Sequence, residues 1–307
     1  MYKEMQLPKA RARHLTRQDR KQLGTGLAFI SPWIVGFLVL IVYPIFISMY
    51  YSFTDFALFH TPNWVGLQNY IELFTKDDKF FLSLYNTVFF FLLAMPASVI
   101  AALALAILLN NHLAGRTFFR SLFFLPTIVP AVASAAVWMW ILNPQWGLLN
   151  LSLRMVGVHG PPWLSSPDWA KPSLVLVALW GIGSEVIIYL AALQEIPRDY
   201  YEAALVDGAS STQRTVFITL PLITPVIFFH LVNGTIWAFQ YFTEAFIMTG
   251  GGPGNATLFY SLYLYRNAFT NVKMGYASAQ AWILFVVVML ATLVIIRSSK
   301  GWVYYEG

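Results

Sequence analysis

Long apolar runs alternate with short polar segments along this 307-residue sequence. A helix needs about 20 consecutive apolar residues to cross the hydrocarbon core of a membrane. Six runs reach that length, so the pattern predicts an all-α protein with six membrane-spanning helices. Prolines inside some runs do not exclude helices, because neighbouring helices in a bundle can satisfy a freed backbone carbonyl. The predicted spans are residues 27–53, 83–109, 119–142, 174–193, 221–248 and 277–296.

The composition fits a lipid environment. Hydrophobic residues make up 58% of the chain and charged residues only 11%, whereas soluble domains carry about 25% charged residues. The chain has no cysteine, which excludes a disulfide framework, a thiolate metal site and a cysteine nucleophile. We therefore expect one membrane domain and no separate soluble domain.

The basic residues predict an orientation. Thirteen of the 19 Lys and Arg residues lie on the side that holds both termini, and six lie in the opposite loops. Because positive charge marks the cytoplasmic side, both termini are expected in the cytoplasm. Seven of the basic residues fall in segment 1–26, before the first apolar run. This tail favours a membrane flank over a nucleic-acid-binding arm, and the apolar run is too long for a signal-peptide core.

The chain is thus expected to have three parts. They are a basic cytoplasmic tail at 1–26, a six-helix membrane domain at 27–296 with a cytoplasmic loop at 194–221, and a cytoplasmic tail at 297–307. The opposite side carries a segment, 143–172, that is rich in Trp and Pro. That composition suits a surface at the membrane interface or against a partner, and a simple connector is the alternative.

The loop 194–221 is polar and helix-prone, and from Tyr200 it reads "YYEAALVDGASSTQRTVFITLP". Asp199 is expected to cap a helix that starts after Pro197, and Gly208 to turn the chain into a second short helix. The result is an elbow that projects into the cytoplasm. We expect its apolar residues to pack it and its charged residues to face outward. The first group is Leu205, Val206 and Phe217, and the second is Glu202, Asp207 and Arg214.

The stretch "EAALVDGASSTQRTVFITLP" resembles the EAA loop of permease subunits in binding-protein-dependent ABC importers. The resemblance extends over nearly the whole chain. It includes "RTFFRSLFFLPTIVP" and "MTGGGPGNATLFYSLYLYRNAF", which is similar to the carbohydrate-uptake branch with its maltose, multiple-sugar and glycerol-3-phosphate permeases. The positions that match the EAA pattern are Glu202, Ala203, Ala204, Gly208, Ile218, Leu220 and Pro221.

The resemblance implies a type I ABC importer permease that moves a sugar or oligosaccharide by alternating access. The elbow would be the coupling helix, seated on a separate ATPase that binds ATP and Mg²⁺, so that this chain needs no cofactor. The implied coupling residues are Glu202, Ala203, Ala204, Asp207, Gly208 and Arg214. The implied partners are a second, non-identical permease, two ATPase subunits or domains and an external solute-binding protein, in the plasma (inner) membrane of a bacterium or archaeon.

No pattern in the sequence indicates catalysis. There is no GxxxxGK motif followed by Ser or Thr, and "TGGGPGN" lacks a lysine, so we expect it to be a tight outer turn. The five histidines lack metal-ligand spacing, and no nucleophile or paired-carboxylate arrangement is present, so we expect neither an enzyme nor a metal site. These histidines are His14, His60, His112, His159 and His230.

Polar residues inside membrane spans usually face a bundle interior or an aqueous cavity. The fifth predicted span carries five such residues at spacings of 4, 3, 1 and 3, which form one helical stripe. They are Asn233, Trp237, Gln240, Tyr241 and Glu244. Rings can stack on a sugar while amides and carboxylates bond its hydroxyls, so we expect this stripe to bind substrate, with Glu185 and Gln280 beside it. Hydrogen bonding between helices is the alternative.

Other functions remain open at this point. Spans three to six contain no internal Lys or Arg, and a phosphorylated or carboxylated substrate would favour such a partner, which makes glycerol 3-phosphate the less favoured cargo. A polyamine importer would share the EAA loop and would suit Glu185 and Glu244. A channel or secondary transporter that works without ATP is the alternative from another class, and it leaves the elbow unexplained.

Overall fold

The computed structural model describes residues 17–57, 61–111 and 115–304, and these residues are mainly helical. The β-type pairing seen within these ranges is an isolated antiparallel bridge between Thr54 and Trp64. The all-α prediction is therefore confirmed. The chain divides into two compact units, Met1–Tyr50 and Tyr51–Gly307.

The described residues of the first unit, 17–50, lie in one long helix. It runs through α1 (Arg17–Phe37), the π-helical segment η1 (Leu38–Val42) and α2 (Tyr43–Ser52). The run Lys21–Ser52 is long and apolar enough to span a membrane, and none of its most apolar stretch is buried. A helix that is hydrophobic all round needs lipid or another protein around it. This helix covers the first predicted span except for its last residue, Phe53.

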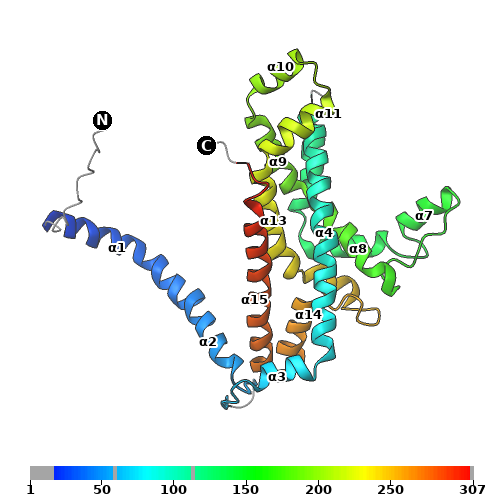
Figure 1. Ribbon diagram of the computed structural model, residues 1–307. Coiled ribbons are helices and arrows are strands. Elements are labelled where there is room, and N and C mark those ends of the chain that lie inside the picture. Colours follow the sequence, from blue (N-terminus) through cyan, green and yellow to red (C-terminus); the bar gives the residue numbers. More distant parts are fainter. Residues whose placement is uncertain (1–16, 58–60, 112–114, 305–307) are drawn as a thin grey trace. The chain divides into compact units, whose positions relative to one another are not determined.

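Two continuous helices of the second unit, α4 (Asp78–Asn110) and α15 (Met274–Ser299), are also long enough to span. α13 (Thr224–Phe239) packs against both of them. Figure 1 shows these three helices side by side, with α10 (Arg198–Val206) at one end and α3 (Gln68–Thr75) at the other. The bundle therefore has an elbow end and an opposite end.

The remaining spans are bent. α5 (Arg116–Ile128) and α6 (Ala131–Ile141) meet at 104°. Pro130 lies between them, and a proline has no N–H with which to continue a helical ladder. α8 (Pro167–Trp180) and α9 (Gly183–Glu195) meet at 50°. Such breaks place non-helical backbone at the depth of the membrane, where it is tolerated when it lines a cavity.

The third bent pair joins Ser211–Leu222 to α13 at 61°. The helical elements before the bend are α11 (Ser211–Arg214), η2 (Thr215–Thr219) and α12 (Leu220–Leu222). When each bent pair counts as one span, the described part of the chain has up to six segments long and apolar enough to cross a membrane, in agreement with the six predicted spans.

The helix of the fifth span ends earlier than predicted. It was expected to continue to residue 248, but α13 ends at Phe239 and the chain becomes helical again only near η3 (Ala245–Thr249). The cause is tertiary. Tyr241 is only 3% exposed and stacks on Phe90 with ring centroids 4.4 Å apart. Burying this ring turns the backbone out of the helix, and packing overrides local helix propensity.

The predicted glycine-rich turn is present after η3. Gly250, Gly251 and Gly254 have positive φ angles, which glycine adopts without steric cost. The side-chain amide of Asn86 on α4 donates to the carbonyl oxygens of Asn255 at 2.9 Å and Leu258 at 3.2 Å. The turn is thus fixed to the bundle.

The chain then forms α14 (Tyr260–Tyr265) and η4 (Arg266–Thr270) before α15. Asp77 links α4, α14 and α15 at the end of the bundle opposite the elbow. Its carboxylate caps α4 through the N–H groups of Lys79 and Phe80, both at 3.1 Å. It also accepts the hydroxyls of Tyr263, at 2.7 Å, and of Tyr276.

The segment between α6 and α8 is held in shape by its own hydrogen bonds. It contains α7 (Leu148–Met155), and its centre is Asn150, whose side chain donates to the carbonyl of Pro144 at 3.0 Å and accepts from Trp163 Nε1 at 2.7 Å. Met155 and Val156 remain exposed. These contacts support an ordered surface more than a simple connector.

Candidate transport cavity and coupling elbow

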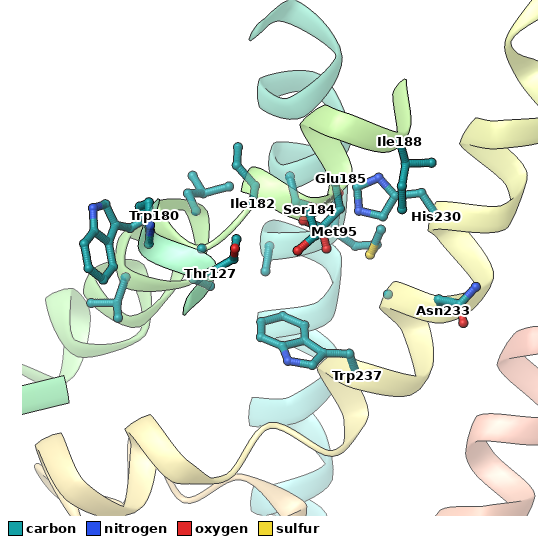
Figure 2. Close-up of a pocket in the computed structure, with 18 of the residues that line it drawn as sticks. Met95, Thr127, Trp180, Ile182, Ser184, Glu185, Ile188, His230, Asn233 and Trp237 are labelled. Atoms are coloured by element: carbon teal, nitrogen blue, oxygen red, sulfur yellow. Dashed lines mark hydrogen bonds between the residues drawn. The ribbon is translucent and has the colours of Figure 1, made fainter. Parts of the chain in front are cut away.

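A cavity of about 540 Å³ lies within the second unit, between α4, α13 and the bends of the two other broken spans. Val129 lines it beside the first bend, and Gly181 and Ile182 line it at the second. Figure 2 shows side chains from these separate elements around one space. The broken helices therefore shape the cavity.

Close approaches of helices set the cavity walls. A Cβ on Gly183 would lie 2.3 Å from the carbonyl oxygen of Phe123, so only a glycine lets α9 cross α5 this closely. A Cβ on Gly234 would lie 2.4 Å from the sulfur of Met95, so α13 also lies close to α4, although the neighbour here is a flexible side chain and not backbone. Close backbone approach is a regular use of glycine.

The lining combines two tryptophans with polar side chains and contains no Lys or Arg. Trp180 comes from α8 and Trp237 from α13, and Figure 2 shows them at separate places on the wall. The polar side chains are Ser98, Thr127, Ser134, Ser184, Glu185, Tyr189, His230, Asn233 and Glu244. An apolar aromatic wall with a few polar groups is the usual character of a small-molecule site.

The polar side chains of the wall differ in whether they have a hydrogen-bond partner. The Tyr189 hydroxyl and His230 Nδ1 lie 2.8 Å apart and join α9 to α13. Glu185 Oε2 is buried and has no hydrogen-bond partner among the described residues. This oxygen is available to accept hydrogen bonds from a ligand.

The structure brings together four of the six predicted substrate residues. Glu185, Asn233, Trp237 and Glu244 line the cavity, although the Asn233 amide also donates to the carbonyl of Phe229 on its own helix at 2.9 Å. Whether these residues bind substrate stays a prediction.

The expected single stripe is wrong, because α13 ends at Phe239. Gln240 forms the C-cap of α13 and Tyr241 packs into the protein core, and neither lines this cavity. Gln280 is likewise buried elsewhere, where its Oε1 accepts from Asn267 Nδ2 at 3.0 Å. Any substrate contact by Gln240 or Tyr241 stays a prediction.

Sequence reasoning missed Trp180 and His230 as lining residues. Trp180 ends α8 directly before the bend, and no signal in a single apolar run shows which face of such a bend points inward. His230 lies on the cavity side of α13, one turn before Gly234. A titratable residue inside an apolar run was the available signal.

The elbow consists of two short helices joined at Gly208, whose φ is +75°. The predicted turn is therefore present. Ser210 Oγ accepts from the N–H of Gln213 at 3.3 Å, and Gln213 Oε1 accepts from the N–H of Ser210 at 2.8 Å. This capping box starts α11. The expectation that Asp199 caps α10 is wrong, because the helix starts earlier: Pro197 is the N-cap, without a side-chain hydrogen bond, and Asp199 lies in the first turn.

The apolar side chains of the elbow do not pack it, contrary to the expectation. Val206 is 89% exposed, Phe217 74% and Leu205 55%. The reason is that the left-handed turn separates two short helices that share no core. We call Leu205, Val206 and Phe217 the docking patch. Exposed apolar patches indicate interaction sites.

The predicted coupling residues belong to the same elbow as the docking patch. Glu202, Ala203, Asp207 and Gly208 are exposed, Ala204 is half-buried, and Arg214 is half-buried rather than fully outward. Arg214 Nε has no hydrogen-bond partner among the described residues. Their role in coupling stays a prediction.

His14, His60 and His112 lie outside the described residues. Where the structure is described, no three His, Cys, Asp or Glu side chains gather so that they could hold a metal ion.

Comparison with known proteins assigns the family. The family model described as "binding-protein-dependent transport system inner membrane component" matches residues 78–303. The probable ABC transporter permease protein YesP of Bacillus subtilis is 45% identical, over 95% of this chain and 96% of that protein. The trehalose/maltose transport system permease protein MalF of Thermococcus litoralis is 35% identical, over 90% of this chain and 93% of that protein.

A solved structure agrees. A chain of a bacterial ABC transporter involved in the import of the acidic polysaccharide alginate superposes with a TM-score of 0.83 and 26% identity, over 92% of this chain and 97% of that chain. The six spans, their bends and the elbow therefore form a type I ABC importer permease fold, and the chain belongs to the binding-protein-dependent transport system inner membrane component family.

Proposed function

We propose that this chain is a permease subunit that passes a sugar or oligosaccharide across the plasma membrane in an ATP-driven importer. The relatives reported above include a trehalose/maltose permease and an alginate transporter. The observation that carries the proposal is the cavity, in which Trp180 and Trp237 accompany Glu185, Asn233 and Glu244 without a Lys or Arg. Rings can stack on the C–H faces of a sugar, and the polar groups can bond its hydroxyls.

The elbow couples transport to ATP hydrolysis in this proposal. The docking patch and the exposed Glu202 would sit on a separate ATPase subunit that binds ATP and Mg²⁺. Closure of two such subunits would draw two elbows together and switch the cavity from inward-open to outward-open. Exposed apolar side chains beside a carboxylate support such a contact.

The complete importer would contain a second, non-identical permease, two ATPase subunits and an external solute-binding protein. One elbow can engage only one ATPase, which supports a second permease. The family description names binding-protein dependence. The excess of basic residues on the elbow side supports cytoplasmic termini.

Trp237→Ala tests the cargo assignment. The complete complex is reconstituted in proteoliposomes with its binding protein, and sugar uptake and ATP hydrolysis are measured together. Loss of one cavity contact costs about 1 kcal/mol, which is a several-fold change. We expect sugar uptake to fall several-fold while ATP hydrolysis stimulated by the binding protein persists.

Trp146→Ala is the matched control, because Trp146 is exposed and lies outside the cavity. Equal uptake by the two variants would contradict the cavity assignment. Uptake that persists without ATP would instead favour a channel or secondary transporter.

A further inference from the structure

Lys171 on α8 is a cation whose partners are an amide and two aromatic rings. Its Nζ donates to Asn86 Oδ1 at 3.1 Å. The same Nζ lies 4.6 Å from the ring centroid of Phe89 and 5.1 Å from that of Tyr85. No carboxylate pairs with it within the described ranges. The positive charge is therefore not neutralised by this part of the protein.

Asn86 holds the ammonium in place. Asn86 is 1% exposed, and its amide nitrogen is committed to the carbonyls of Asn255 and Leu258. Its oxygen must therefore face Lys171. An ammonium has three N–H donors, and only one of them is used by a hydrogen bond here. The remaining donors are free for an anion.

The surroundings of Lys171 are open and apolar. Tyr85 is 60% exposed, and Phe89, Leu92, Pro96 and Ile100 are also exposed on α4. Their spacings of four, three, four and four residues put them on one face of the helix. This face extends from the Lys171 ammonium to Ile100, about half the length of α4, and it could hold an extended apolar chain.

Lys171 of α8 lies against the part of α4 near Tyr85 and Phe89, and the depth of this part can be compared with that of the lipid headgroups. α4 has 33 residues, which makes it about 50 Å long, whereas the hydrocarbon core is about 30 Å thick. If the helix is centred, about 10 Å projects at each end. Tyr85 lies roughly 10 Å from the start of α4, at the boundary where interfacial aromatic residues gather. Phe89 lies one turn deeper, at roughly 17 Å.

We propose that Lys171, Tyr85 and Phe89 form a binding site for the phosphate of a phospholipid. An acyl chain of this lipid lies along the exposed face of α4. The lipid belongs to the leaflet at the end opposite the elbow, which is the outer leaflet in the proposed orientation. The site is separate from the transport cavity, and its existence does not depend on the cargo.

Lys171→Met tests the site in the complete detergent-purified complex. Native mass spectrometry counts the phospholipids that remain bound after delipidation. We expect the wild-type complex to retain one phospholipid per copy of this chain that Lys171→Met loses. Added phosphatidylglycerol should raise the Tm of the wild type but not of Lys171→Met. Diacylglycerol with the same acyl chains, or inorganic phosphate, should not raise it.

Two controls separate the site from general charge and from misfolding. Lys79→Met removes an exposed lysine from the start of α4 and should leave lipid retention unchanged. Lys171→Arg should retain the lipid. If Lys171→Met fails to assemble, Tyr85→Ser at an exposed position gives the same test through weakened retention.

Three results would overturn the proposal. They are equal lipid retention by Lys171→Met and the wild type, an equal loss in Lys79→Met, and carbodiimide cross-linking of Lys171 to a carboxylate of another subunit. The last result would assign the surface to a protein partner.

Discussion

Asp77 is the residue that ties together the end of the bundle opposite the elbow. Four donors from three helices converge on its carboxylate: two backbone N–H groups of α4 and the hydroxyls of Tyr263 and Tyr276. Burial raises the pKa of Tyr263 to about 12, and the hydrogen bond to Asp77 adds to this shift. The hydroxyl therefore stays a donor well above neutral pH.

The raised pKa of Tyr263 predicts a loss of stability in alkali. The unfolded chain releases this proton near pH 10, whereas the folded chain holds it to about pH 12. The stabilisation is therefore complete below about pH 10 and is lost as the pH rises towards about 12. Tm measured across this range should fall less steeply for Tyr263→Phe than for the wild type. Parallel curves would contradict the assignment.

At the scale of elements, the elbow depends on one backbone conformation. A side chain at Gly208 would meet no atom within 4 Å, but its φ of +75° strains any L-residue. β-Branched residues are the least compatible with this region, whereas Asn enters it several-fold more often. Glycine is favoured here by the positive φ angle of the turn and not by a lack of room for a side chain.

Gly208→Val should therefore separate insertion from coupling. We expect this variant to reach the membrane but to co-purify with less ATPase and to lose most uptake, because the docking patch is displaced. Gly208→Asn is the matched control and should keep most of both activities. Full uptake and normal co-purification of Gly208→Val would show that the elbow is not the coupling element.

The elements also show how far the sequence could be interpreted. Apolar run length predicts the number of spans, and the pattern around Gly208 predicts the turn, because both depend on local chemistry. The end of α13 depends on Tyr241 meeting Phe90, which is about 150 positions away in the chain. The same holds for the cavity, whose Trp180 and Glu185 lie on opposite sides of one bend. A local pattern of residues does not predict contacts between segments that are distant in the sequence.

At the scale of the whole molecule, much of the surface is apolar and uncovered. None of the most apolar stretch of helix Lys21–Ser52 is buried, and the docking patch is open at the elbow. Both features are expected of one subunit taken from a larger assembly in a membrane. Within such an assembly, the proposed mechanism is alternating access of one cavity.

Cysteine accessibility of the cavity tests alternating access most directly, because the chain has no cysteine of its own. Ser184→Cys places one thiol in the cavity wall, and Phe285→Cys places a control thiol on the exposed apolar side of α15. In the reconstituted complex, an impermeant thiol reagent should label Cys at 184 only from the elbow side without nucleotide. It should label this position only from the opposite side in the ATP-trapped state, and sugar should slow the reaction. The control should stay unlabelled. Labelling of position 184 from both sides in one state, or from neither side in either state, would contradict the account.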